Sequence, residues 1–200
     1  MNCAQALEQL KEQIGDCQLC DLATGRQHIV IGRGAPAARI MLIGEGPGAG
    51  EDKQGLPFVG RAGQLLDKIL AAAELPTEDT YICNVVKCRP PNNRLPLPEE
   101  VLVCKAFLRK QIKIVYPQII VCLGALATQV LVDKQAKITR VRGQWLKKGA
   151  FWIMPTFHPA ALLRDENKKR LVWLDMQEVR DKYRQLIKDD QSRRYSDEND

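Results

Sequence analysis

Four short apolar stretches, each followed by a helix pattern, constrain the fold of this chain more than any other feature. Strands that alternate with helices predict an α/β fold in which a mostly parallel sheet is covered on both faces. Two further segments, residues 28–31 and a hairpin-like pair across 141–151, could add strands. The four predicted strands are residues 39–43, 81–86, 118–123 and 151–155, and the helix patterns are residues 63–70, the segment from Pro98, residues 125–131 and about 166–187.

Length and composition fit one globular domain. The chain has 200 residues, of which 45% are hydrophobic, enough for a full core. We expect residues 1–187 to form this domain and residues 188–200, which lack an apolar pattern, to be a disordered tail. The N-terminal segment is amphipathic and unlike a signal peptide, and no apolar run is long enough to span a bilayer. We therefore expect a cytoplasmic, nucleoid-associated monomer that makes no membrane contact.

The net charge of +6 allows an anionic partner such as a nucleic acid. An ordinary basic protein can have the same charge, so the charge alone does not show whether this chain binds a nucleic acid.

A glycine-rich loop, residues 44–60, connects the first predicted strand to its helix. Its six glycines let backbone N–H groups come close to a ligand. A phosphate-binding loop would need lysine and hydroxyl partners, whereas this loop carries the carboxylates of Glu45, Glu51 and Asp52. The loop is therefore not a nucleotide P-loop, and its acidity suits a ligand that is uncharged or becomes cationic.

The seven cysteines suggest a metal centre rather than disulfides, because no export signal precedes them. Cys83 and Cys122 fall in apolar strand patterns typical of the core, and Cys3 lies near the terminus. The remaining four could form a four-thiolate site. Iron–sulfur and zinc both accept such a set, and an unligated set is a third reading. These four are Cys17 and Cys20, which form a Cys-x-x-Cys pair, Cys88 and Cys104.

Polar residues at the ends of the predicted strands define a second candidate site. Ligands of parallel sheets bind at the carboxyl ends of the strands. One crevice could therefore gather a carboxylate, an amide, an imidazole and glycine backbone, with an aromatic ring from the glycine-rich loop. Such a set could hold a small planar polar ring. Its members are Gly44, Glu45, Phe58, Asn84, Gly124 and His158.

Several motifs resemble the family 4 uracil-DNA glycosylases, the iron–sulfur members of the uracil-DNA glycosylase superfamily. The resemblance runs from about Cys17 to Ile187, with the motifs in the same order and spacing. It implies a three-layer α/β/α sandwich around a four-stranded parallel sheet, and a 4Fe-4S cluster held by Cys17, Cys20, Cys88 and Cys104. The motifs are GEGPG at 44–48, GLPFVGRAG at 55–63, NVVKCRPPNNR at 84–94 and HPAALLR at 158–164.

The resemblance implies that the chain removes uracil from single- and double-stranded DNA, leaving an abasic site for base excision repair. Glu45 would stabilise the cationic sugar or orient the attacking water, and His158 would donate to uracil O2. Asn84 would pair with the O4 and N3–H edge, which cytosine presents with the opposite polarity. Further substrate contacts would come from Gly44, Gly46 and Gly48, from Phe58 stacked on the ring, and from Glu51 against the C5 position, where thymine has its methyl group.

The base must leave the duplex to reach such a pocket. HPAALLR would supply a wedge for the vacated stack, formed by Ala161, Leu162 and Leu163, with Arg164 on phosphate. Further phosphate contacts are expected from Lys87, Arg89, Arg94 and Arg142.

Blander interpretations compete with several of these roles. His-Pro after a strand is commonly a capped turn, Phe58 could be a core aromatic, and Leu162 and Leu163 could be a buried helix face. Asn84 could satisfy neighbouring backbone.

Two departures from related branches are informative. Glu45 is followed by Gly46 and Pro47 rather than by proline directly, so direct water activation is in doubt. Residues 92–96 contain no histidine, which favours turnover over covalent capture of DNA.

Two other classes of function are weighed against the glycosylase. A cluster protein for binding or electron transfer is disfavoured by the presence of Glu45, Asn84 and His158. A nucleotide-binding enzyme is disfavoured by the missing P-loop lysine and hydroxyl.

Overall fold

The computed structural model describes residues 2–197, with side chains to residue 192. Its centre is a six-stranded sheet in the order β1-β3-β2-β4-β6-β5. The helices are α1 (Cys3–Ile14), α2 (Leu22–Gly25), α3 (Ala49–Gln54), α4 (Arg61–Ala72), α5 (Pro98–Val115), α6 (Ala125–Leu131), α7 (Ile138–Val141), α8 (Pro159–Leu162) and α9 (Asn167–Asp197), with 3-10 turns at Thr77–Asp79 and Pro91–Asn93. The strands are β1 (Arg33–Gly34), β2 (Ile40–Gly44), β3 (Thr80–Asn84), β4 (Ile119–Leu123), β5 (Leu146–Lys148) and β6 (Phe151–Thr156).

The predicted α/β class is confirmed, but the expectation of four strands is wrong. The four predicted strands are β2, β3, β4 and β6, which are parallel to one another. The short strands β1 and β5 pair antiparallel at the two edges. The N-terminal edge strand lies at 33–34, not at 28–31. Segment 28–31 is instead irregular: Val30 N–H donates to the Lys87 carbonyl at 2.8 Å, and the Gln111 side chain donates to the Ile31 carbonyl at 2.9 Å.

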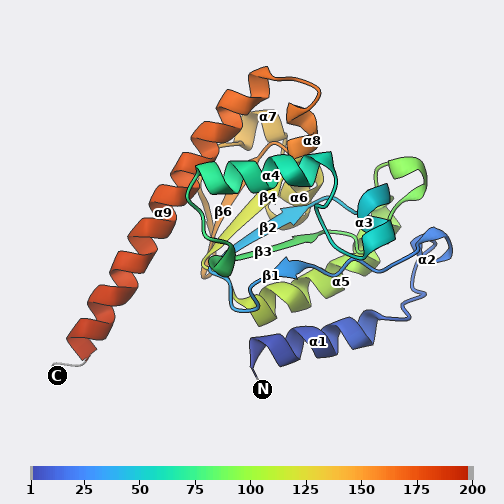
Figure 1. The fold of residues 1–200 in the computed structure, drawn as a ribbon, viewed down its shortest axis with the longest axis horizontal. Helices are drawn as coiled ribbons and strands as arrows, with labels where there is room; N and C mark the ends of the chain where they lie inside the picture. The colour runs from blue at the N-terminus through green and yellow to red at the C-terminus, as the bar shows by residue number, and fades with distance from the viewer. Residues whose placement is uncertain (1, 198–200) are drawn as a thin grey trace.

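Alternating strand residues enter two cores, one on each face of the sheet. In β2, Ile40 and Leu42 pack with α4, α8 and α9, whereas Met41 and Ile43 pack with α5 and α6. Figure 1 shows α4 and α9 on one side of the sheet and α5 on the other, with α1 outside α5. The three-layer arrangement is therefore present, and α1 adds a helix outside the second face.

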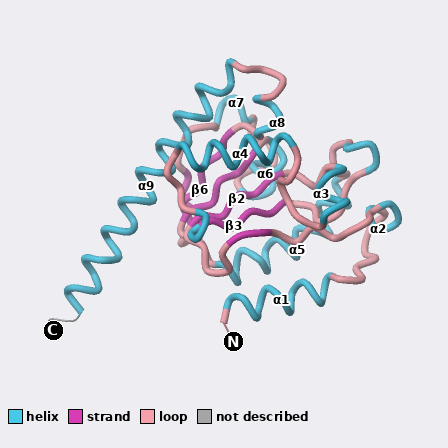
Figure 2. The backbone as a smooth tube through the Cα atoms, in the orientation of Figure 1, coloured by secondary structure: helices cyan, strands magenta, loops and turns pink. Residues whose placement is uncertain are grey.

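Helix α9 runs to Asp197, so the expected disordered tail is helical over most of its length. Its buried face carries Val172, Met176, Val179 and Tyr183, at helical spacing. Beyond Ile187 the helix projects past the sheet (Figures 1 and 2). Polar contacts help to hold its extension, because Asp190 accepts a hydrogen bond from Gln118 at 3.2 Å and lies 3.6 Å from Arg39. Residues 198–200 of the predicted tail lie outside the described part.

None of the described helices is both long and apolar enough to cross a bilayer.

Two helical glycines differ sharply in the space around them, which gives a matched stability test. A Cβ on Gly63 of α4 would lie 1.8 Å from the Phe58 carbonyl oxygen. A Cβ on Gly50 of α3 would meet Val59 Cγ2 at an ordinary 3.8 Å. We expect Gly63→Ala to lower the free energy of unfolding by about 2 kcal/mol or more, because backbone must move.

The control, Gly50→Ala, should be neutral or raise that free energy by roughly 0.5–1 kcal/mol, since alanine favours helix. Urea unfolding measures both. Equal effects of the two substitutions would contradict the packing described around Gly63.

Candidate active site and cysteine centre

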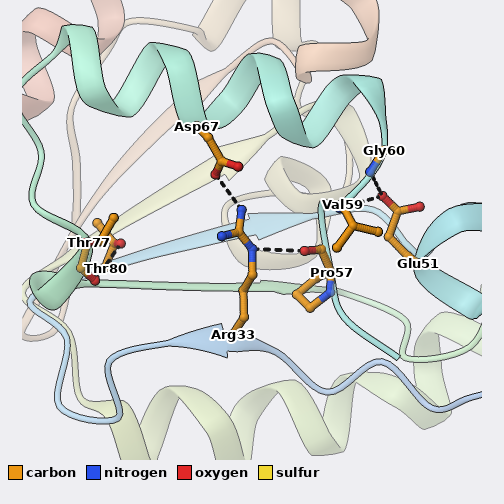
Figure 3. A network of polar contacts seen from close by, with 8 residues as sticks. All are labelled: Arg33, Glu51, Pro57, Val59, Gly60, Asp67, Thr77 and Thr80. Atoms are coloured by element: carbon orange, nitrogen blue, oxygen red, sulfur yellow. Dashed lines mark hydrogen bonds and ion pairs between the residues drawn. The ribbon is translucent and has the colours of Figure 1, made fainter. Parts of the chain in front are cut away.

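Hydrogen bonds with two side chains hold the glycine-rich loop: Glu51 belongs to the loop itself, and Arg33 belongs to β1. The Glu51 carboxylate accepts hydrogen bonds from the N–H groups of Gly48, Val59 and Gly60, each at 3.1 Å. Arg33 donates to the Pro57 carbonyl at 3.1 Å and pairs with Asp67 of α4 at 2.5 Å (Figure 3). Glu51 therefore acts as a brace of the loop. Its expected contact with the C5 position of uracil stays a prediction.

Gly44 is closely approached by the side chains of Asn84 and Phe58. It pairs with Asn84 in the sheet register. A Cβ at this position would lie 2.5 Å from Asn84 Oδ1 and 2.6 Å from Phe58 Cζ. Only glycine leaves room for both side chains. Phe58 itself has a positive φ of 56°, which turns the loop so that its ring reaches the strand ends.

Asn84 is 1% exposed, and its side-chain oxygen has no hydrogen-bond partner within the described structure. A buried amide oxygen without a donor carries a desolvation cost of roughly 1–3 kcal/mol. The side-chain oxygen of Asn84 therefore does not accept a hydrogen bond from neighbouring backbone, as one alternative interpretation had it. A ligand N–H would satisfy it.

His158 caps α8 and also contacts Phe58. Its Nδ1 accepts the N–H of Ala160 at 3.1 Å, so the neutral ring carries its proton on Nε2. Burial, with a smaller contribution from Arg164, lowers the pKa of His158 to about 4, and Glu51 opposes this shift. The ring stacks on Phe58 with centroids 5.5 Å apart. His158 is thus both a helix cap and a neutral donor.

Glu45 follows Gly44 and is half-buried. Burial raises the pKa of its carboxyl group, and Arg164 opposes the rise. The residue lines a cavity of about 90 Å³ with Gly46, Gly48 and the Pro90–Pro96 loop. Gly46 fits there because a Cβ would lie 2.7 Å from Val86 Cγ2. The structure therefore gathers Gly44, Phe58, Asn84 and His158, with Glu45 beside them.

The HPAALLR segment divides into a buried and an exposed part. Leu162 is 1% exposed and belongs to the core, whereas Leu163 is 42% exposed. Ala161 is half-buried, packed against the same core. Arg164 is exposed and acts electrostatically on both Glu45 and His158. Of the expected wedge residues, Leu163 presents a large apolar surface to solvent.

The four basic residues expected on phosphate are mostly engaged within the protein. Lys87 is buried, and its ammonium group donates to the Asn84 carbonyl at 2.5 Å. Arg94 holds Glu100 through two bonds of 2.9 and 2.7 Å, and Arg142 pairs with the buried Asp175. Arg89 donates to Asn93 at 2.8 Å. The expectation that Lys87 contacts phosphate is therefore not compatible with its position.

The cysteines of the predicted centre lie near one another where α1, the 84–94 segment and α5 meet. Burial raises the pKa of the Cys88 thiol to about 11; Arg26 opposes this, and the Cys104 and Cys20 thiols add to it. Burial also raises the pKa of Cys104, with further contributions from Cys20 and Cys17. Cys83 and Cys122 are buried in the core, as predicted.

N–H groups already point at two of these sulfur atoms. Lys87 N–H donates to Cys104 Sγ at 3.3 Å, and Arg26 lies 3.6 Å from Cys88 Sγ while donating to the Cys17 carbonyl at 2.7 Å. Donors of this kind stabilise thiolate ligands. Across residues 2–197, however, no three His, Cys, Asp or Glu side chains close on one metal ion.

Sequence reasoning did not find the roles of Arg26 and Arg33. Both lie in irregular segments whose partners are distant in sequence. The burial of Lys87 had a visible signal, since Lys87 lies in the run YICNVVKC, in which Asn84 is the other strongly polar residue.

Comparison with known proteins agrees with this architecture. The model of the Uracil DNA glycosylase superfamily matches residues 31–179, so the chain belongs to this superfamily. The chain is 47% identical over 182 residues to the Type-4 uracil-DNA glycosylase of Thermotoga maritima, which covers 88% of this chain and 94% of the relative. The chain belongs to the type-4 branch, which confirms the resemblance inferred from the sequence.

Two other relatives are a second type-4 protein and a type-5 protein. The Type-4 uracil-DNA glycosylase of Archaeoglobus fulgidus is 42% identical over 169 residues, covering 80% of this chain and 84% of the relative. A Type-5 uracil-DNA glycosylase of Pyrobaculum aerophilum is 31% identical over 142 residues, covering 62% of each chain.

The lowered pKa of His158 predicts a specific pH dependence of stability. In the unfolded chain His158 takes up a proton near pH 6.5, whereas in the folded protein it stays neutral until about pH 4. The stabilisation that this neutral histidine gives is present above the unfolded pKa and is lost as the pH falls from 6.5 to 4. His158→Asn keeps a capping side chain and removes this titration.

Denaturant unfolding of both proteins between pH 4 and 8 gives the measurement. The difference in unfolding free energy, wild type minus variant, should fall with decreasing pH and level off near pH 4. A difference that does not change with pH would contradict the neutral, buried state of His158.

Proposed function

We propose that this protein is a uracil-DNA glycosylase that binds an extrahelical uracil and hydrolyses its N-glycosidic bond, initiating base excision repair. The observation that carries the proposal is the unpartnered Asn84 oxygen, buried beside Gly44 and Phe58. Uracil N3–H can donate to this oxygen while the Asn84 amino group donates to O4. Cytosine has an acceptor at N3 and a donor at C4, so both contacts would be lost.

His158 supports the departure of uracil as an anion. When the N1–C1′ bond breaks, its electron pair goes to uracil and charge develops on O2. The Nε2–H of a neutral imidazole can donate to this oxygen, helped by the Gly46 N–H. A neutral ring suits the role because its low pKa prevents protonation at physiological pH. Phe58 stacks on the ring of His158, and we propose that its ring also stacks on uracil.

Glu45 acts on the other product of bond breaking, the cationic sugar. Its ionised carboxylate stabilises the positive charge that develops at C1′. Water adds to C1′, and the proton that the water loses balances the one that the uracil anion takes up. Burial raises the pKa of this carboxyl group, and the positive charge of Arg164 opposes the rise and so favours the ionised form. Contacts from Gly44, Gly48 and Glu51 complete the pocket. We assign charge stabilisation to Glu45 as its main role, because the offset of Pro47 disfavours a separate water-holding contact.

DNA is held around this pocket by the exposed part of HPAALLR. Leu163 fills the stack that uracil leaves, and Arg164 contacts phosphate. Because the pocket takes an extrahelical base, we expect both single- and double-stranded DNA to be substrates, acted on by a monomer associated with the nucleoid in the cytoplasm.

A 4Fe-4S cluster on Cys17, Cys20, Cys88 and Cys104 completes the proposal. The four cysteines lie close together, with N–H donors on two sulfur atoms. When bound, the cluster supplies a crosslink between α1, the Cys88 loop and α5. The chemistry at uracil is left to Glu45, Asn84 and His158.

Uracil release from a labelled oligonucleotide, followed by alkaline cleavage of abasic sites, tests the reaction. Wild type should release uracil from single and double strands, which alkali then cleaves, whereas strands with cytosine or thymine at the same position should stay intact. Glu45→Gln and Asn84→Ala should each lower kcat/KM by roughly 10²-fold or more, since each removes a contact to the reacting group. The control is Glu99→Gln, an exposed carboxylate on α5.

An inactive wild type would refute the glycosylase proposal. Full activity in Glu45→Gln or Asn84→Ala would leave the reaction in place but refute the assigned site.

Iron analysis and the visible spectrum test the metal. Wild type prepared without oxygen should be brown and contain about four iron atoms per chain, as a 4Fe-4S cluster requires. Cys104→Ser should lose colour and iron, because Cys104 is one of the four proposed ligands. Cys122→Ser, at a core cysteine outside the proposed set, should keep both. A colourless wild type that contains zinc would refute the cluster.

A further inference from the structure

Lys87 is buried at the junction of the uracil pocket and the cysteine centre. Its side chain is 1% exposed. Lysine is almost never fully buried without a partner of opposite charge, because an ammonium ion loses most of its hydration in the interior. Within the described structure no carboxylate pairs with it, since the ion pairs found there do not include Lys87.

On one side, Lys87 reaches the residue that reads the uracil edge. Its Nζ donates to the main-chain carbonyl of Asn84 at 2.5 Å. Asn84 is the last residue of β3, and the Val85 and Val86 N–H groups that follow it donate to the Gly44 and Glu45 carbonyls. The ammonium group of Lys87 adds a contact to the Asn84 carbonyl itself, in the backbone from which the Asn84 amide projects over Gly44.

On the other side, Lys87 reaches the thiols. Its own N–H donates to Cys104 Sγ at 3.3 Å, and it precedes Cys88 in the chain. Burial raises the pKa of both Cys104 and Cys83, and the positive charge of Lys87 opposes this rise at each thiol. Four thiolates around a cluster form an anionic group, which supplies the opposite charge that the described carboxylates do not.

We propose that Lys87 is a positioning residue that couples the two sites: its ammonium group orients Asn84 for uracil and is neutralised by the thiolate-bound cluster. The proposal rests on the proposed function, and it adds a specific reason for placing a cluster beside a pocket whose reaction is not a redox reaction. The negative charge of the cluster makes it possible to bury the Lys87 ammonium group, which holds the Asn84 carbonyl.

Lys87→Met tests the coupling, because methionine fills similar space without charge or donor. Lys113→Met, the same substitution at an exposed position of α5, is the control. The first readout is the midpoint potential of the cluster. Loss of a nearby positive charge should make the potential more negative in Lys87→Met and leave it unchanged in Lys113→Met. Equal potentials in the three proteins would overturn the charge compensation.

The second readout is a double-mutant cycle on kcat/KM for uracil release. Lys87→Met should lower kcat/KM about tenfold or more when Asn84 is present, and by less than about twofold in the Asn84→Ala background. Independent, multiplicative effects would overturn the action through Asn84, because a general structural defect would lower both backgrounds alike.

If Lys87→Met does not fold or load a cluster, Lys87→Arg replaces it. Arginine keeps the charge but is too large for the same contact with the Asn84 carbonyl. The potential should then stay at the wild-type value while kcat/KM falls; a shifted potential or unchanged excision would overturn the proposal.

The two readouts separate this proposal from the one on which it rests. An inactive wild type refutes the glycosylase but leaves the potential measurement interpretable. A wild type that releases uracil without a cluster leaves the cycle interpretable.

Discussion

The parallel register of β2 and β3 carries Gly44 to the level of Asn84, and the pocket is built on this pair. The two strands end together, so their next residues leave the sheet from one edge. Gly44 N–H and C=O groups remain in the ladder, and Gly44 O accepts the Val85 N–H at 2.9 Å. Because Gly44 has no side chain, the space above it is filled by Phe58 and Asn84. A one-residue slip would turn Asn84 to the other face of the sheet.

The acidity of the glycine-rich loop is divided between structure and chemistry. Glu51 is saturated by three backbone N–H groups, and the buried Asp52 accepts the N–H groups of Gln27 at 2.9 Å and His28 at 3.3 Å. Both carboxylates are therefore committed to holding the loop. The Glu45 carboxylate makes no hydrogen bond to another described residue, and burial raises its pKa. Of the three, it is the one free to respond to charge in a ligand.

The sequence was sufficient for the parallel strands and for the residues at their ends. Each strand is an apolar run between helix patterns, and the position of Asn84 or His158 follows from the end of its strand. Of the two edge strands, β5 lies within the predicted hairpin-like segment 141–151, whereas β1 was predicted at 28–31 and lies at 33–34, because a strand of two residues carries no period. The Phe58–His158 stack also escaped, because it depends on a positive φ at Phe58 that the sequence pattern does not specify.

Charged residues were the least predictable part of the site. Lys87, Arg94 and Arg142 have the composition of a phosphate-binding surface, yet their partners lie within the fold. Sequence gives the sign of a charge but not the carboxylate or carbonyl that tertiary structure brings to it. Arg164 differs because it follows a short helix and stays at the surface, close to the pocket.

The cysteine centre depends on a small separate core. Leu10 and Ile14 of α1 pack with Ile31, and Phe107 and Ile114 of α5 lie against them. This packing, together with the Arg26 bond to the Cys17 carbonyl, brings the Cys-x-x-Cys pair to Cys88 and Cys104. The superfamily match begins at residue 31, after this pair, so two of the four thiols lie outside the matched residues. A core of so few side chains buries little apolar surface, and metal–thiolate bonds across it would add the stability that burial alone does not provide.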